Sequence, residues 1–416
     1  MSVVRRCLSF ARLDQGVRSH VICVLEETGE TMEQLADTRD WTASDLVRDE
    51  RWRFHLTRAQ SDELRAGVDG AMSRRSPASL LDFAPQDFDF GSAIEVFRAA
   101  TAEAMRGRGL ALVRGVDVAQ FDETRFRLLT WGLGLHLGVA APQGKASQYI
   151  SDVRDAGGVY KSPTGRGYNT RVALDYHSDH ADLVMLSTLR RARTGGESIV
   201  SSTIAAHREM AVRDPALCEV LHSPFWYGRQ GEEAPDERPA YKSSIFAVSD
   251  GVLLSRYVRK NITFGQTIPH VPKLGANQLE ALDLFDSIIS DPTLAFRMTL
   301  EPGDFQILNN YCTVHSRTAF EDYEEEGSKR HLFRLWLSTP DGPRLPDSWA
   351  DFCGVVAPGG VRRGVRGHAY DRRCAEFERR VAAWHHMVLP EAERPESQRQ
   401  WPSEEALADA ARGVLA

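Results

Sequence analysis

The stretch that decides the fold is residues 170–202, TRVALDYHSDHADLVMLSTLRRARTGGESIVSS, with His177-Ser178-Asp179 near its centre. The preceding residues 171–176 are partly β-branched and aromatic, so they predict a strand. Because successive side chains of a strand point to opposite faces, His177 and Asp179 would point the same way. Two such ligands are two-thirds of a 2-His-1-carboxylate triad, whose open positions suit Fe(II) and O₂. The triplet alone is weak, and it needs a second histidine from a distant strand.

That histidine has one good candidate. Residues 300–308, LEPGDFQIL, predict a tight turn that leads into an apolar strand, and His315 follows it. Residues 330–337, RHLFRLWL, predict a further strand on which Arg330 and Arg334 share a face. Two guanidiniums on a core-like strand are costly unless each meets an anion. A metal beside a carboxylate receptor suits a 2-oxo-dicarboxylate, whose distal carboxylate would pair with an arginine.

The order of these motifs resembles the iron(II)- and 2-oxoglutarate-dependent dioxygenases of the taurine dioxygenase (TauD/TfdA) family. HxD is followed by Gly195-Gly196-Glu197-Ser198, then by the distant histidine and by two arginines with R-x-x-x-R spacing. The resemblance runs from about residue 88 to residue 338. Its most specific phrases are YHSDHADLVML, LEPGDFQILNN, HSRTAFED and RHLFRLWLS.

The resemblance implies a metal centre and its chemistry. It implies His177, Asp179 and His315 as the iron ligands. It also implies that Fe(II), 2-oxoglutarate and O₂ together remove hydrogen from an unactivated C–H bond, with release of succinate and CO₂. Hydroxylation is the usual outcome in the family, although desaturation or ring closure would use the same residues.

The resemblance also implies which residues bind the two organic molecules. Arg330 matches the partner of the C5 carboxylate of 2-oxoglutarate, and Ser198 matches a hydroxyl that often contacts the same group. Arg334 matches a position that in some members meets the anionic group of the prime substrate. Independently, loops beside a metal site commonly handle substrate. The pocket candidates on the loops before the HxD triplet are Lys145, Gln148, Tyr168 and Asn169.

Two functions of other classes compete with this prediction. One is a binding or structural jelly-roll module that retains a metal without turnover, and the other is a Zn²⁺-dependent hydrolase with the same ligands. The complete set of HxD, His315 and paired arginines argues against the first. Nothing in a hydrolase mechanism explains why two arginines would share one strand face.

Composition narrows the partners and the compartment. The 416 residues carry a net charge of −7, and no run of Lys or Arg is long enough for a nucleic-acid surface. No apolar run approaches the length of a membrane span, and the first residues lack a clear targeting signal. The six cysteines are scattered and predict reduced thiols in a cytoplasmic protein. We therefore expect a small-molecule substrate, no nucleic acid and no membrane, and we leave a homo-oligomer open.

The expected architecture is α+β to mainly β, with a double-stranded β-helix (jelly-roll) core and flanking helices. Residues 1–76 would be an N-terminal extension with a short strand at 21–25. Residues 77–340 would form the dioxygenase domain, with an insertion at 214–275 that contains an Asp250-Gly251 hairpin turn. Residues 341–416 would be a helical tail packed on or near the core. The predicted helices are 58–72, 92–106, 123–136, 203–213, with His207 on its surface, 277–289 and 371–387.

Overall fold

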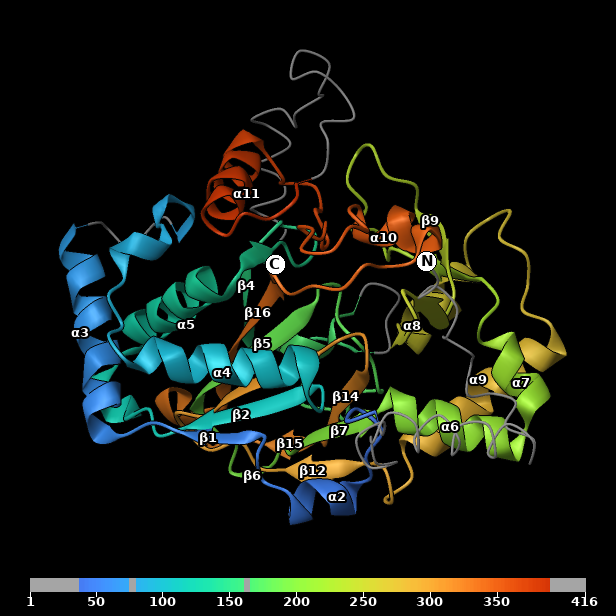
Figure 1. Ribbon diagram of the computed structural model, residues 1–416, viewed down its shortest axis with the longest axis horizontal. Helices are drawn as coiled ribbons and strands as arrows, with labels where there is room; N and C mark the ends of the chain where they lie inside the picture. Colours follow the sequence, from blue (N-terminus) through green and yellow to red (C-terminus); the bar gives the residue numbers. More distant parts are fainter. Residues whose placement is uncertain (1–36, 75–79, 161–164, 390–416) are drawn as a thin grey trace, which may run out of the picture.

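The computed structural model of this protein describes residues 37–74, 80–160 and 165–389. Helices and strands are mixed: a large sheet, a smaller sheet and several helical layers lie around three hydrophobic clusters (Figure 1). The strand expected at residues 21–25 lies outside the described residues. No helix of the described chain is both long and apolar enough to cross a membrane.

The large sheet has seven strands in the order β1-β2-β13-β5-β16-β3, with β4 paired to β16. All of its pairs are antiparallel except β1 with β2. Its strands are β1 (Arg53–His55), β2 (Leu110–Arg114), β3 (Val139–Ala141), β4 (Ile150–Val153), β5 (Leu183–Arg190), β13 (Phe305–Asn309) and β16 (His331–Ser338). The predicted strands at 305–308 and 330–337 are therefore confirmed as β13 and β16.

Helices cover one face of this sheet. They are α3 (Arg58–Arg74), α4 (Ala93–Arg106), α5 (Glu123–Leu137) and α11 (Arg372–Trp384). Phe333, Leu335 and Leu337 of β16 pack with buried aromatic side chains of these helices, which is the face that strand alternation predicts for them. Asp122 caps α5 by accepting a hydrogen bond from the backbone N–H of Arg125 at 2.8 Å.

The other face of the large sheet packs on the small sheet. This sheet has the order β12-β7-β14, with β12 (Phe296–Met298), β7 (Ser198–Ser202) and β14 (Thr313–Arg317). Val200 and Phe296 lie in one buried cluster with Val184, Leu308 and Trp336 of the large sheet. Apolar side chains between two sheets stabilise their facing arrangement. A short pair, β6 (Thr194–Gly195) with β15 (Phe320–Glu321), lies beside the small sheet.

The strand predicted at residues 171–176 is wrong. This segment runs extended along β14, but its hydrogen bonds change register by one residue. Leu174 donates to the carbonyl of Arg317 at 3.0 Å, whereas His177 donates to the carbonyl of His315 at 3.0 Å. The irregular spacing prevents a continuous ladder, so only isolated bridges remain at His177, one with His315 and one with Val258. The regular strand of this region, β5, begins after the HxD triplet.

The segment predicted as an insertion, together with its flanking helices, has its own core. It contains α6 (Thr203–Arg213), α7 (Pro215–Val220), β8 (Phe225–Gly228), β9 (Ala240–Ser243), β10 (Phe246–Ser249), β11 (Val252–Ser255), α8 (Arg259–Gly265) and α9 (Ala276–Ile289). Buried residues of these elements form one hydrophobic cluster. The predicted hairpin is confirmed: Asp250 and Gly251 join β10 to β11 with φ of +49° and +78°.

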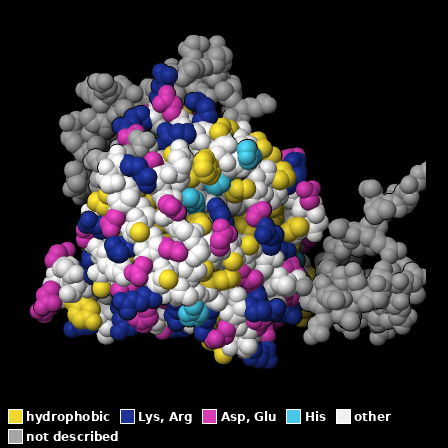
Figure 2. Space-filling model, turned by 60° about the vertical axis from the view of Figure 1, so that its left-hand side comes forward, with side chains coloured by type: hydrophobic (Ala, Val, Ile, Leu, Met, Phe, Trp, Pro, Cys, Tyr) yellow, Lys and Arg dark blue, Asp and Glu magenta, His cyan; other side chains and the backbone are white. Residues whose placement is uncertain are grey.

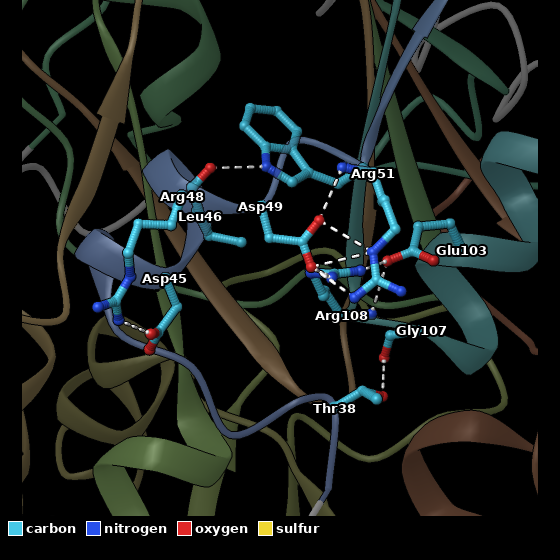
Figure 3. A network of polar contacts seen from close by, with 10 residues as sticks. Thr38, Asp45, Leu46, Arg48, Asp49, Arg51, Glu103, Gly107 and Arg108 are labelled. Carbon is cyan, nitrogen blue, oxygen red and sulfur yellow. Dashed lines mark hydrogen bonds and ion pairs between the residues drawn. The ribbon is translucent and has the colours of Figure 1, made fainter. Parts of the chain in front are cut away.

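The chain before α3 is tied to the corner between α4 and β2 (Figure 3). Asp49 follows α2 (Ala43–Arg48) and forms an ion pair with Arg108, which also pairs with Glu103 at 2.8 Å. The indole N–H of Trp52 donates to the carbonyl of Leu46 at 3.0 Å. Since β1 then pairs with β2, this segment extends the large sheet at its edge.

The chain after β16 is anchored next to the HxD triplet. Beyond α10 (Ala350–Cys353), the buried guanidinium of Arg362 donates to Asp182 at 2.8 Å. Asp182 also accepts a hydrogen bond from Tyr311 at 2.8 Å and another from the backbone N–H of Thr339 at 2.9 Å. A buried charge pair with this many hydrogen bonds holds its segment firmly.

The surface shows no segregation of charge on the face drawn in Figure 2. Acidic and basic side chains lie side by side there, with single apolar residues between them. This pattern agrees with the modest net charge of −7.

Candidate active site

A cavity of about 160 Å³ opens between the two sheets and the loops at one end of them. His177, Asp179, His315, Arg330 and Arg334 all line it. Seven of its lining side chains are arginine or lysine and three are aspartate or glutamate. The structure therefore brings the separate sequence motifs to one place that favours negatively charged molecules.

His177 and His315 are fixed side by side by their backbones. The N–H of His177 donates to the carbonyl of His315 at 3.0 Å, and the N–H of His315 donates back at 2.8 Å. Their ring centroids are 4.3 Å apart. The Nδ1 of His177 donates to the carbonyl of Asp175 at 2.9 Å, so its Nε2 keeps the lone pair. That tautomer is the one a metal ligand needs.

Asp179 is buried and only partly satisfied. Its backbone N–H donates to the side chain of Asn310 at 2.8 Å, and its Oδ1 accepts from Arg334 at 3.3 Å. Its Oδ2 has no hydrogen-bond partner among the described residues and lies 3.6 Å from Nε2 of His315. Burial by itself would raise the pKa of Asp179, but Arg334 and the nearby histidines outweigh it and lower the pKa.

The three side chains together fit a divalent cation. Burial lowers the pKa of His315 to about 3, so the imidazole is neutral at pH 7. Ligand atoms of His177, Asp179 and His315 all lie within 4.8 Å of one another. A buried carboxylate oxygen without a partner in the described chain, beside two imidazole rings, is the donor set of a 2-His-1-carboxylate centre.

Arg330 and Arg317 are buried cations that lack a carboxylate partner in the described chain. Arg330 makes one long hydrogen bond, to the carbonyl of Val153 at 3.4 Å. Arg317 donates to the carbonyl of Thr170 at 2.8 Å, while its Nε and one terminal nitrogen are unsatisfied. Burial, with Arg317 nearby, lowers the pKa of Arg330 to about 9. Two such groups call for an anion between them.

Ser198 lies at the same end of the cavity. Its hydroxyl donates to Gln306 at 3.0 Å, and the residue lines the cavity beside Arg330. Gly196 has φ of +73°, and a Cβ there would come within 3.1 Å of Nε of Arg330. The glycine is thus required both by its backbone conformation and by the close approach of the guanidinium.

The remaining predicted substrate residues divide into two groups. Arg334 lies under the ring of Tyr168, with 5.3 Å between the guanidinium carbon and the ring centroid, and both line the cavity. The structure does not bring Lys145, Gln148 or Asn169 to the cavity wall: Lys145 is exposed, and only its neighbour Gly144 lines the cavity.

Sequence reasoning missed several cationic side chains. Arg317 is two residues after His315 on the same strand, and this shared parity was the available signal. Lys260 lines the outer cavity, where it donates to the carbonyl of Tyr160 at 2.7 Å and has no carboxylate within ion-pair distance in the described chain. Burial, with Arg166 nearby, lowers the pKa of Lys260 to about 8. Nothing in the local sequence indicated that α8 would reach this cavity.

A further buried arginine lies behind the cavity wall. Arg256 is enclosed by the rings of Tyr227, Tyr241 and Phe352, with its guanidinium carbon 3.7 Å from the Phe352 centroid. It lies 3.2 Å from Nε2 of His180, and His180 lines the cavity next to Asp179. Because arginine can only donate, this contact fixes the proton of a neutral His180 on Nδ1. Arg256 therefore holds His180 in place from behind the cavity wall. His180 supports the wall next to Asp179 and is not one of the three proposed metal ligands.

Residues 74–336 match the model of the taurine catabolism dioxygenase TauD, TfdA family. The match covers well over half of the chain, and the chain belongs to this family of iron(II)- and 2-oxoglutarate-dependent dioxygenases. The match confirms the predicted enzyme class over the non-catalytic module and the zinc hydrolase. The enzyme uses Fe(II) as its cofactor and consumes 2-oxoglutarate and O₂ as co-substrates.

Individual relatives agree with this assignment. The chain is 37% identical to FR-33289 synthase of Streptomyces rubellomurinus over 250 residues, which cover 58% of this chain and 72% of the relative. It is 27% identical to uridine-5'-phosphate dioxygenase of an Amycolatopsis species over 56% of this chain and 86% of that protein. The crystal structure of the non-heme iron oxygenase OrfP with Fe and alpha-ketoglutaric acid superposes with a TM-score of 0.51, at 17% identity. That superposition covers 68% of this chain and 93% of OrfP, and it shows that the fold is shared.

Proposed function

We propose that His177, Asp179 and His315 hold the iron and that the enzyme oxidises a C–H bond of a small anionic molecule. The observation that carries this proposal is the unpartnered Oδ2 of Asp179, which faces His315 at 3.6 Å inside the cavity. When bound, iron(II) with 2-oxoglutarate and O₂ supplies the oxidant that removes hydrogen, with release of succinate and CO₂.

The residues of the chain then have separate tasks. The carbonyl of Asp175 holds His177 in the tautomer whose Nε2 can bind the metal. Arg334 donates to the other carboxylate oxygen of Asp179 and so orients the group. Arg330, with Arg317 beside it, receives the distal carboxylate of 2-oxoglutarate, and Ser198 contacts the same group. The close walls keep bulk water away from the reacting carbon.

The charge of the outer cavity supports an anionic prime substrate. If one carboxylate of 2-oxoglutarate occupies Arg330 and Arg317, Lys260 is still without an anionic partner in the described chain. A substrate with a carboxylate, phosphate or sulfonate would provide one. Uridine-5'-phosphate dioxygenase, named for a phosphate-bearing molecule, is among the relatives. Arg334 and Tyr168 would contact the part of the substrate nearer the iron.

We also propose the detailed architecture of the core and the cellular location of the protein. The facing sheets support a double-stranded β-helix core between an N-terminal extension, residues 1–76, and a C-terminal tail, residues 341–416. The scattered cysteines, four of which are free and buried, support a cytoplasmic location. Hydroxylation is the expected outcome because it needs no second hydrogen abstraction.

Anaerobic addition of Fe(II) and 2-oxoglutarate tests the centre. The wild-type protein should develop the weak visible charge-transfer band of the chelate, and His315→Ala should lose it together with its iron affinity. Wild-type iron affinity in His315→Ala would overturn the ligand assignment. A panel of small carboxylates, phosphates and sulfonates, scored by succinate formation, then tests the substrate class.

A further inference from the structure

A second group of metal-binding side chains lies outside the cavity. His207 on α6, Cys218 on α7 and His222 just after α7 have ligand atoms that all lie within 4.8 Å of one another. None of the three lines the cavity. In Figure 1 the two helices lie at the right-hand side of the molecule, away from the large sheet. The proposed oxidation reaction does not use these three residues.

Local structure places two of the ligands on one face. After α7 ends at Val220, the chain continues in turns in which His222 donates to the carbonyl of Glu219 at 3.1 Å. Cys218 and His222, four positions apart, therefore lie about one helical turn apart on the same side. His207 meets them from α6, half-buried rather than on the surface as the sequence predicted.

The contacts within the group are few and point inward. The Nε2 atoms of His207 and His222 are 2.9 Å apart, so one proton at most can lie between them. Cys218 is 4% exposed, and its Sγ makes only a long contact of 3.8 Å with the carbonyl of His207. The ring of Phe246 packs against both imidazoles, with centroids 4.8 and 5.8 Å away.

We propose that His207, Cys218 and His222 form a binding site for a Zn²⁺-type divalent cation that joins α6 to α7. One thiolate and two imidazoles are a donor set that selects such ions, and a three-ligand site leaves a position for water or a nearby carboxylate. Besides burial, the carboxylate of Glu219 acts on two pKa values: it helps to raise that of the Cys218 thiol and opposes the lowering of that of the His222 imidazole, which shows a negative charge near the group. A tetrahedral zinc ion would hold two nitrogens about 3.3 Å apart, so the histidines need to separate by only about half an ångström.

The protonation states agree with this geometry. Burial, with His222 beside it, lowers the pKa of His207 to about 4, and burial also lowers the pKa of His222. Both imidazoles are thus neutral and able to bind a metal at pH 7. Burial raises the pKa of the Cys218 thiol to about 11, so binding must release one proton from it.

Cobalt(II) distinguishes this group from the active centre. The full-length protein, freed of metal with a chelator, is titrated with CoCl₂ and followed by absorbance. A thiolate ligand gives a thiolate-to-cobalt charge-transfer band, which the active centre lacks because its donors are nitrogen and oxygen. We expect two equivalents of Co(II) to bind per chain, and the final intensity of the thiolate band to correspond to one of them.

Matched variants complete the test. Cys218→Ser should lose the thiolate band and weaken binding at this group at least about a hundredfold. Cys374→Ser, a buried cysteine of α11 outside any such group in the described chain, should keep the band. His222→Gln should also weaken binding, and it serves if Cys218→Ser does not fold. Absence of the band in the wild-type protein, or its persistence in Cys218→Ser, would overturn the proposal and leave a hydrogen-bonded histidine pair.

Discussion

Two of the groups of three side chains that could hold a metal ion in the described chain differ in their surroundings. His177, Asp179 and His315 line a cavity of about 160 Å³ with an excess of cationic side chains. His207, Cys218 and His222 lie between two helices under the ring of Phe246. The first group faces space for other molecules, whereas the second faces apolar side chains.

The side chains that surround the two groups, more than the ligand side chains themselves, distinguish the functions that we propose for them. In the first group, a carboxylate oxygen has no hydrogen-bond partner in the described chain, and the buried guanidiniums nearby have no carboxylate partner there. A centre that binds a metal ion and an anionic co-substrate requires such groups. The second has a thiol whose only hydrogen-bond contact in the described chain is the long one with the carbonyl of His207, so the thiol is available to a metal ion.

The largest difference should appear in turnover. His315→Ala removes a proposed iron ligand, so succinate formation should fall by more than about a hundredfold, since even supporting partners of metal ligands are worth ten- to a hundredfold. Cys218→Ser should leave turnover within about twofold at saturating Fe(II). A Cys218→Ser enzyme as inactive as His315→Ala, while still folded, would mean that the two groups are not independent.

A large effect on stability should come from the tail. Arg362→Ala leaves the carboxylate of Asp182 buried without its charged partner, which costs about 3–5 kcal/mol in the free energy of unfolding. Because Asp182 is three residues from Asp179, the variant should also weaken iron binding, yet keep the cobalt–thiolate band at Cys218. Urea unfolding measures the first effect. Unchanged stability would show that this ion pair does not anchor the tail.

The co-substrate residues should give a more selective effect. Arg330→Ala removes the proposed partner of the distal carboxylate of 2-oxoglutarate. The apparent binding free energy of 2-oxoglutarate should therefore weaken by about 2–5 kcal/mol, while the affinity for iron stays unchanged. Arg330→Lys should recover part of it because the charge remains but the bidentate geometry is lost. Arg334→Ala should instead affect the prime substrate and the position of Asp179. The readout is the Michaelis constant for 2-oxoglutarate, and exchanged phenotypes would show that the two roles are reversed.

Most of the fold could be predicted because it depends on local patterns. The alternation of β16 was visible in RHLFRLWL, and the Asp250-Gly251 turn in its flanking apolar runs. The strand predicted at 171–176 was wrong for a physical reason: the pairing of this segment with β14 slips by one residue, and nothing in the composition of the segment signals a slip. Propensity describes single residues, whereas register depends on the partner.

The site could be predicted where residues follow a strand and not where loops and helices converge. His177, Asp179 and His315 were proposed from spacing and resemblance, and the structure brings them together; Arg317 could have been added from its parity with His315. Lys260 and Arg256 reach the cavity region through tertiary packing alone, and Lys145 was placed by loop position but is exposed. For the same reason the sequence placed His207 on the surface, since its partner His222 comes from the next segment.

The last expected effect concerns acid stability and one buried histidine of each group, His207 and His315. The pKa of His207 is lowered to about 4 in the folded protein, against about 6.5 when unfolded, so the unfolded state binds a proton first as the pH falls. Stability from a neutral His207 is therefore complete above about pH 6.5 and is lost between there and about pH 4, at no more than about 1.4 kcal/mol per pH unit. In metal-free protein, His207→Gln should flatten urea-unfolding stability across this window. His315→Gln should extend the flattening to about pH 3, because burial lowers the pKa of His315 further. Added Zn²⁺ should oppose the acid loss in the wild-type protein more than in His207→Gln, and an identical response of the two proteins would remove the second group from the comparison.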